Sequence, residues 1–310
     1  MGCLIALMVI SSKNLERILR ALEHRQNPSL RGVAADLGVS SSWLRRQIQH
    51  LRQDAIIKAW RFALHPEVQQ QQRTFFFFLK TNPTEPLIVE ELLTSYSGGQ
   101  LRSLEGITGE FSLAGRFHFP SGSEFLASLD HLYELIGGSG FQKYQMLEVI
   151  SVHKEWGFNI PQLSMTLKDS EHSVLQDIQE LGKAMEFPPS TYDIAKKLDK
   201  RQPSIYRQLK RWKGGNVILG YSLSTTYWQE RYIHAYIQIK APLGKYQILI
   251  DFCQENTHVM DCFRTNQEYS LLIKTRHATL TDLNDFLKAL YKQTKVTDTV
   301  THIILDGLRL

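Results

Sequence analysis

The feature that most constrains the fold is the pattern at residues 29–51, SLRGVAADLGVSSSWLRRQIQHL. Its first part predicts a half-buried helix, because apolar residues recur at i, i+3, i+4 and i+7, at Leu30, Val33, Ala34 and Leu37. Gly38 follows where a tight turn needs a residue that reaches positive φ without steric cost. The serines at 40–42 are good N-caps for a second helix, which would bury Leu44, Ile48 and Leu51. The pattern predicts a helix-turn-helix.

The same pattern occurs a second time, at residues 190–212 (STYDIAKKLDKRQPSIYRQLKRW), and aligns without a gap at an offset of 161. Apolar positions coincide, and the exposed Arg46 falls on Arg207. A single copy would equally fit a helical hairpin with a solvated basic face. Two copies favour a duplicated DNA-binding unit.

The exposed face of each second helix carries the residue types that contact DNA. We expect contacts from Ser41, Ser42, Trp43, Arg45, Arg46 and Gln49 in the first half, and from Gln202, Ser204, Tyr206, Arg207 and Lys210 in the second. Arginine pairs bidentately with guanine, glutamine with adenine, and serine hydroxyls suit phosphates. Any of these side chains could instead belong to a solvated helix face. Because Arg45 aligns with Tyr206 and Ser42 with Pro203, the two half-sites need not be identical.

The distribution of charge agrees with a polyanionic partner. The chain has a net charge of +5. Residues 13–66 hold ten Lys/Arg against four Asp/Glu, and residues 168–228 hold ten against seven. The rest of the chain is therefore net negative, and the basic excess lies in the two segments expected to meet phosphates.

Composition bounds the class of protein. A chain of 310 residues, 43% hydrophobic and 22% charged, is typical of soluble globular domains. Its three cysteines, Cys3, Cys253 and Cys262, form no CxxC, and the histidines show no metal-ligand spacing. We expect no metal, no cofactor and no catalytic set. The apolar first ten residues are too short to span a bilayer, so we expect a cytoplasmic protein with no membrane partner.

The order of predicted elements is duplicated too. Each helix-turn-helix is preceded by a helix (13–23, 171–185) and followed by an exit strand (56–64, 216–223). A βαββαβ series follows each time, with strands at 74–80, 101–107, 110–119 and 144–153 and helices at 86–95 and 122–137 in the first copy. In the second copy the strands are at 232–240, 258–264, 269–276 and 299–304, and the helices at 245–255 and 281–291.

The predicted fold class is α+β, with two helix-turn-helix domains each followed by a ferredoxin-like (RAM-type) domain, as an internal tandem repeat. The predicted domains are residues 12–66, 70–157, 168–228 and 229–310, the first and third being the DNA-binding ones.

This order of elements resembles the Lrp/AsnC, or feast/famine, family of transcriptional regulators. The resemblance is carried by residues 29–67 and by HVMDCFRTNQEYSLLIKTRHATLTDLNDFL in the second half. The family's central hairpin typically reads T-G-x-Y/F-D. Here the two copies are TGEFS (108–112) and NQEYS (266–270).

The resemblance implies a small-molecule effector, such as an amino acid, at an interface between ferredoxin-like modules near that hairpin. The residues that would bind it are Thr108, Gly109, Ser112, Asn266, Glu268 and Ser270. Ser112 and Ser270 replace the usual aspartate, which removes an obvious partner for an α-amino group. Ordinary members carry one copy and dimerise, so this chain is expected to form a pseudo-dimer by itself or a homo-oligomer.

Two other interpretations stay open. Siroheme decarboxylases look like Lrp/AsnC proteins, and His65, His118, His234 and Arg231 could line a tetrapyrrole cleft. However, the family's His/Tyr/Arg-rich run is not seen in QQQRTFFFFL or WQERYIHAYIQI. The chain could also be an effector or oligomerisation protein that no longer binds operators, although the positive charge on both helix-turn-helix segments argues against this.

Overall fold

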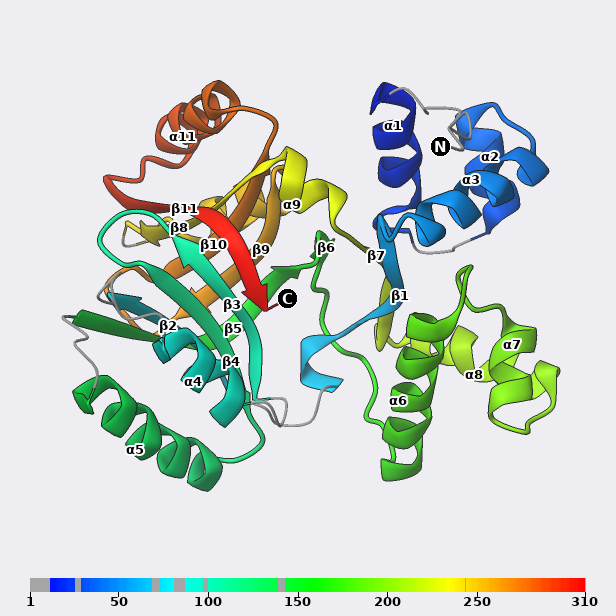
Figure 1. The fold of residues 1–310 in the computed structure, drawn as a ribbon, viewed down its shortest axis with the longest axis horizontal. Coiled ribbons are helices and arrows are strands. Elements are labelled where there is room, and N and C mark those ends of the chain that lie inside the picture. Colours follow the sequence, from blue (N-terminus) through cyan, green and yellow to red (C-terminus); the bar gives the residue numbers. More distant parts are fainter. Residues whose placement is uncertain are drawn as a thin grey trace, which may run out of the picture. The chain divides into compact units, whose positions relative to one another are not determined.

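The computed structural model describes residues 12–25, 29–68, 73–80, 87–96, 100–138, 143–242 and 244–309. These residues form two compact units, and each unit combines a piece of both halves of the chain (Figure 1). The first unit comprises the residues up to Leu64 together with Met165–Thr226, and the second comprises His65–Ser164 and Tyr227–Leu310. No helix among the described residues is long and apolar enough to cross a membrane.

The first unit contains both helix-turn-helix segments. From the first half come α1 (Ser12–Leu22), α2 (Leu30–Leu37), α3 (Ser41–Gln53) and β1 (Ile57–Leu64). From the second half come α6 (Asp169–Ala184), α7 (Thr191–Lys197), α8 (Gln202–Gly214) and β7 (Ile218–Thr225). The helices and exit strands expected from the sequence are therefore present in both copies, with ends shifted by a few residues.

The turns of the two helix-turn-helix segments have the same backbone conformation. Gly38 is left-handed with φ 69°, and Asp199, at the equivalent position, has φ 50°. The next residue in each copy donates its N–H to the carbonyl of an alanine in the preceding helix, Val39 to Ala34 and Lys200 to Ala195, both at 2.9 Å. Glycine meets this requirement without strain, and aspartate is among the residues that tolerate it best.

Strands β1 and β7 join the two halves as an antiparallel ribbon, with Phe62 opposite Tyr221 and Trp60 opposite Leu223. A two-stranded ribbon is marginal by itself, so it needs packing against helices. Helix α6 supplies that packing: a Cβ on Gly182 would lie 2.4 Å from the Trp60 carbonyl oxygen, so glycine is required for this close approach.

The second unit contains the two ferredoxin-like modules. The first has η1 (Pro66–Val68), β2 (Arg73–Lys80), α4 (Leu87–Ser95), β3 (Leu101–Ile107), β4 (Leu113–Phe119), α5 (Gly122–Gly138), β5 (Lys143–Glu155) and β6 (Phe158–Asn159). The second has α9 (Tyr227–Arg231), β8 (Ile233–Lys240), α10 (Tyr246–Glu255), β9 (Val259–Thr265), β10 (Leu271–His277), α11 (Leu280–Thr294) and β11 (Asp298–Arg309). The predicted βαββαβ order is thus present in both copies.

The two modules close into one barrel. The strand order is β2-β4-β3-β11-β8-β10-β9-β5, and β5 also pairs with β2, so these eight strands form a closed circuit (Figure 1). The modules meet at two equivalent seams, β5 with β9 and β11 with β3, where Val149 pairs with Thr265 and Ile304 with Ile107. Closure leaves the eight strands without an open edge.

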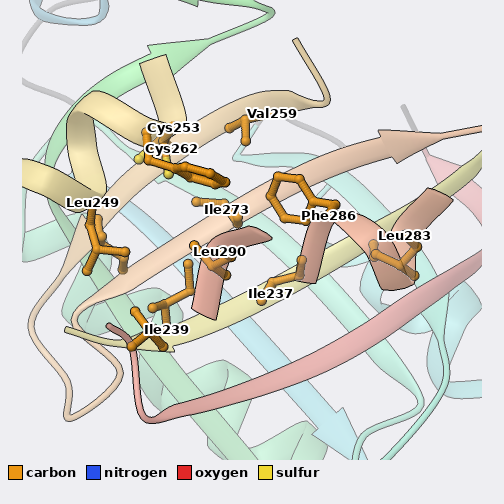
Figure 2. Packing of buried hydrophobic residues seen from close by; sticks show 14 residues of the cluster. Ile237, Ile239, Leu249, Cys253, Val259, Cys262, Ile273, Leu283, Phe286 and Leu290 are labelled. Atoms are coloured by element: carbon orange, nitrogen blue, oxygen red, sulfur yellow. The ribbon is translucent and has the colours of Figure 1, made fainter. Parts of the chain in front are cut away.

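Three apolar clusters stabilise the second unit. Strand β2 serves two of them, because its side chains alternate: Phe75 and Phe77 pack toward α4 and α5, and Phe76 and Phe78 pack in the barrel interior. The interior cluster takes residues from both modules, including Tyr236 and Phe263. The third cluster lies under α10 and α11, where Figure 2 shows Phe286, Leu290 and the free cysteines Cys253 and Cys262.

Several boundaries differ from the sequence expectation, among them the end of β11, which was expected at 304 and lies at Arg309, and two others have a clear structural reason. The strand expected at 110–119 begins only at Leu113, because Gly109 (φ 106°) turns the chain and Phe111 packs into the interior cluster. The strand expected to end at 153 continues to Glu155 and returns as β6 through Trp156 and Gly157, both with positive φ as a type I′ turn requires.

Candidate functional site

Helix α3 is oriented by its buried face. Ser40 caps it, since its Oγ accepts the Trp43 N–H at 3.1 Å. The buried side chains are Leu44, Ile48 and Leu51. The residues predicted to contact DNA lie on the other side: Ser41, Ser42, Arg45 and Arg46 are exposed, and Trp43 and Gln49 are half-buried.

Helix α8 repeats this arrangement. It begins with Pro203 in its first turn, where a missing N–H costs nothing, and it buries Ile205, Leu209 and Trp212. All of the predicted contact residues are exposed: Gln202, Ser204, Tyr206, Arg207 and Lys210. Tyr206 is 58% exposed, which is unusual for a large aromatic side chain. Gln202 also donates from Nε2 to the Thr191 Oγ1 of α7 at 3.2 Å.

Arg45 has a partner that the sequence pattern did not indicate. Its guanidinium lies over the Phe187 ring, 4.4 Å from the ring centroid, so it also bridges the two halves of the unit. Arg46 and Arg207, which occupy equivalent positions, are both exposed. The Arg207 Nε donates to the Pro203 carbonyl of its own helix at 3.4 Å. The pair Arg46 and Arg207 is therefore the part of the basic face that both copies share.

The first helix-turn-helix is fixed to the second half by backbone acceptors in the last turn of α6 and in the connection to α7. Arg52, in the last turn of α3, donates from Nη2 to the carbonyls of Lys183 (3.2 Å) and Met185 (3.0 Å). Trp60 in β1 donates to the carbonyl of Glu186 at 3.1 Å. These bonds hold α3 by its C-terminal end, opposite to the end that carries Ser41 and Ser42.

The predicted effector residues lie at the two seams of the barrel. Thr108 and Asn266 occupy equivalent positions, and each bonds to a strand of the other module, Thr108 to β11 and Asn266 to β5. Thr108 donates its N–H to the Ile303 carbonyl (2.8 Å) and accepts the Ile303 N–H on Oγ1 (3.1 Å). Asn266 does the same with Glu148, at 3.2 and 3.0 Å. These side chains thus hold the two modules together.

The other predicted effector residues surround these hairpins. A Cβ on Gly109 would approach His302 Nδ1 to 3.1 Å. Ser112 donates from N and Oγ to the Leu79 carbonyl, at 2.9 and 3.2 Å. The backbone carbonyl of Ser270 accepts the Thr265 N–H at 2.9 Å, and the exposed Glu268 pairs with Lys240. The structure therefore gathers Thr108, Gly109 and Ser112 at one hairpin and Asn266, Glu268 and Ser270 at the other.

Buried charges line the barrel, and sequence reasoning did not identify them. Glu105, only 2% exposed, accepts from the Tyr236 hydroxyl at 2.5 Å and from Lys274 Nζ at 2.6 Å. Arg116, at the position equivalent to Lys274, pairs with the buried Glu155. Burial and the Glu105 carboxylate raise the pKa of the Tyr236 hydroxyl. Polar residues at alternate positions of a strand can face either solvent or the interior of a barrel. The sequence pattern is the same in both cases, so it could not show that these charges are buried.

The residues considered for a tetrapyrrole site have local partners. His65 is buried, with Nε2 bonded to the Pro161 carbonyl (2.9 Å) and Nδ1 accepting the Glu67 N–H (3.2 Å). His234 Nε2 bonds to the Trp228 carbonyl at 3.0 Å, and burial lowers its pKa to about 4. Burial also lowers the pKa of His118 to about 2. Arg231 is exposed at the end of α9.

Two helix-turn-helix segments joined by a ribbon, with two ferredoxin-like modules closed into a barrel, define a tandem-duplicated α+β architecture. Residues 234–308 match the model of the Lrp/AsnC ligand binding domain. In this respect the second half of the chain is similar to the Lrp/AsnC family, and the first half repeats its order of elements.

Two proteins similar in sequence are named as transcriptional regulators. An uncharacterized HTH-type transcriptional regulator of Pyrococcus furiosus is 28% identical over 115 residues, which cover 37% of this chain and 78% of that protein. A second one, of Pyrococcus abyssi, is 27% identical over 118 residues, covering 38% of this chain and 80% of that protein. Each match is thus shorter than one of the two repeats.

A solved structure matches nearly the whole chain. The siroheme decarboxylase NirDL superposes with a TM-score of 0.61 at 12% identity, covering 95% of this chain and 91% of that one. At this identity the likeness is one of fold. It confirms the α+β class and the duplicated two-part arrangement.

Proposed function

We propose that the chain is a sequence-specific DNA-binding transcriptional regulator that reads two half-sites, one through α3 and one through α8. One observation carries the proposal: Arg46 and Arg207 stand exposed at the same point of two helices whose opposite faces are fully buried. The Lrp/AsnC module and the relatives named as HTH-type transcriptional regulators support it.

The chemistry of the two faces predicts what they read. Arg46 and Arg207 would pair with guanine edges in the major groove, with Gln49 available for adenine. Ser41, Ser42, Ser204 and Lys210 suit phosphates, which set the register without reading sequence. Arg45 is shared with Phe187, so its contribution to reading bases should be smaller than that of Arg46.

The duplication changes the expected operator. The β1–β7 ribbon places both helix-turn-helix segments in one unit of one polypeptide, where ordinary dimers need two chains. The two reading faces differ, since Tyr206 stands where the first copy has Arg45. We therefore expect an operator with two unlike half-sites, whose centres are separated by one helical turn of about 34–36 Å or a multiple of it.

The experiment is selection of bound sequences from random DNA with the full chain at two salt concentrations. We expect a bipartite, non-palindromic site, and an affinity that falls steeply with salt because phosphate contacts release counterions. Arg46→Ala should erase sequence preference in one half-site and Arg207→Ala in the other. Lys288→Ala, which removes a charge from α11 in the other unit, is the matched control and should change neither. Absence of any enriched sequence would reject the proposal.

We place a small-molecule effector at the barrel hairpins. The groups there are hydroxyls and amides, with Ser112 and Ser270 where the family has a carboxylate, so an amino acid would lack its usual α-amino partner. Because Thr108 and Asn266 bond across the seams, a ligand there would alter the contact between the modules. Thermal-shift measurements with single amino acids test this: a shift abolished by Ser112→Ala or Ser270→Ala supports it, and no shift with any amino acid rejects amino-acid sensing.

A second candidate function, decarboxylation of siroheme, has one observation in its favour. The whole chain shares the fold of NirDL, which has also been solved with an iron-uroporphyrin III analogue. Against it, His65 and His234 are both bonded to backbone carbonyls. Mixing the purified protein with siroheme distinguishes the two functions: a shift of the absorbance bands, lost in His234→Gln, would favour the enzyme.

A further inference from the structure

Three potential metal ligands meet in the second module, outside the sites described above. His258 precedes β9, His277 ends β10, and Asp282 lies in the first turn of α11. Their ligand atoms all lie within 4.8 Å of one another. His258 Nε2 is 3.5 Å from Asp282 Oδ1, and His277 Nδ1 is 3.7 Å from Asp282 Oδ2.

Two of the three side chains are held in position from behind. His258 Nδ1 donates to the Arg276 carbonyl at 3.0 Å, which leaves the lone pair of the neutral ring on Nε2, the atom that faces Asp282. Such a bond is the usual way in which a metal-binding histidine is oriented. Asp282 Oδ2 accepts the Ala278 N–H at 3.0 Å. Both residues are about one-third exposed, which gives an ion a path from solvent.

His277 is the member that needs an explanation. Its side chain is completely buried, and no polar atom of the described residues is close enough for a hydrogen bond to its ring, Asp282 Oδ2 being 3.7 Å from Nδ1. The ring is stacked on His258, with centroids 4.8 Å apart, and lies 5.2 Å from Phe286. Burial disfavours the charged imidazolium, and the neutral ring is the form that binds a metal. A buried polar group without a partner is costly, and it commonly marks an ion that binds there.

The first module shows that the fold does not require these residues. An offset of 158 aligns the corresponding strands and helix of the two modules, and it places Gln100, Phe119 and Glu124 at the three positions. The surrounding backbone is the same. His118 donates its N–H to the Gln100 carbonyl at 2.8 Å, as Arg276 does to His258 at 2.9 Å. Glu124 donates its N–H to a serine cap, as Asp282 does to the Thr279 cap. Phenylalanine thus serves at position 119 where the second module has a buried histidine.

We propose that His258, His277 and Asp282 bind a divalent first-row transition-metal ion, Zn²⁺ in the first place. Two imidazoles and one carboxylate suit Zn²⁺, Ni²⁺, Cu²⁺ or Fe²⁺ and not the all-oxygen preference of Ca²⁺ or Mg²⁺. The two His–Asp separations approach the roughly 3.3 Å between ligand atoms of a tetrahedron with bonds of about 2.0–2.1 Å. Three protein ligands leave one coordination position open. The ion would tie β9, β10 and α11 together at one end of the module, whatever the chain does with DNA.

The test is titration of the full chain with Co²⁺, followed by displacement with Zn²⁺. We expect visible d–d absorption that saturates at one Co²⁺ per chain and disappears when Zn²⁺ is added, with the Zn²⁺ stoichiometry confirmed by calorimetry. His258→Gln and His277→Phe install the residues of the first module, so folding should be retained. Each should weaken binding by more than the ten- to hundredfold typical of losing an outer-shell partner.

Asp282→Asn keeps the shape of the side chain and removes its charge, and it should also weaken binding. His131→Gln, which changes an exposed histidine of α5, should bind like the wild type. If circular dichroism shows that His277→Phe does not fold, the metal affinities of His258→Gln and Asp282→Asn still test the proposal. Wild-type protein that neither shows d–d absorption nor binds Zn²⁺ overturns the proposal, and so do variants of all three residues that bind with unchanged affinity.

Discussion

The side-chain amide of Gln179 forms hydrogen bonds with the backbone of β1 on the edge that does not pair with β7, as a neighbouring strand would. Its Oε1 accepts the Phe62 N–H at 3.0 Å and its Nε2 donates to the Phe62 carbonyl at 2.7 Å. One side chain of α6 thus satisfies both backbone groups that Phe62 directs away from β7. The ribbon that joins the two halves therefore depends on a helix of the second half.

Gln179→Ala should lower the stability of the first unit by about 1–3 kcal/mol, because two part-buried backbone groups lose their partner. Chemical denaturation followed by tryptophan fluorescence measures this, since Trp60 and Trp212 lie in that unit. Gln176→Ala, at an exposed position of the same helix, is the control and should leave the midpoint unchanged. Equal effects of the two variants would contradict the bridging role of Gln179.

Arg45→Ala and Arg46→Ala should separate a structural arginine from a base-reading one. Arg45 loses its position over Phe187, which should cost about 0.5–1 kcal/mol of folding stability. Arg46→Ala should leave stability unchanged and weaken operator binding by about 1–3 kcal/mol. Fluorescence anisotropy with a selected operator and thermal denaturation measure the two quantities. The assignment is wrong if Arg45→Ala weakens DNA binding as much as Arg46→Ala without affecting stability.

The duplicated order of elements was predictable because it depends on local signals. Helix periodicity, the turn at Gly38 and the buried run of β2 each act within a few residues, and each is confirmed. The repeat aligns without a gap, and the structure shows that the second turn matches the first, although Asp199 replaces glycine there.

What could not be predicted depends on residues far apart in sequence. The seams of the barrel join Thr108 to Ile303 and Asn266 to Glu148, and no periodicity reports such pairs. The stacking of Arg45 on Phe187 and the meeting of His258, His277 and Asp282 have the same character. Histidine spacing along the chain gave no sign of that cluster, because its members come from three different elements.

Glu105→Gln should destabilise the second unit strongly. The substitution leaves the Lys274 ammonium facing a neutral amide in the barrel interior, and breaking a buried pair typically costs about 3–5 kcal/mol. Glu268→Gln breaks the exposed pair with Lys240 and should leave the unfolding midpoint unchanged. Differential scanning calorimetry of the two variants makes the comparison. A small effect of Glu105→Gln would show that the interior is hydrated.

The stability of the second unit should fall as the pH drops below 6.5, because several of its histidines, among them His118 and His234, resist protonation. Burial lowers the pKa of His234 to about 4 and that of His118 to about 2. An unfolded histidine has a pKa near 6.5, so below that pH the unfolded state binds more protons than the folded one. Each histidine then lowers the free energy of unfolding by up to about 1.4 kcal/mol for each unit that the pH falls. This continues down to about pH 4 for His234 and about pH 2 for His118. Urea denaturation at about pH 7 and about pH 5 measures how steeply the free energy of unfolding changes with pH. His118→Gln should reduce this pH dependence by the contribution of one histidine. A slope unchanged in that variant would mean that His118 is protonated in the folded protein.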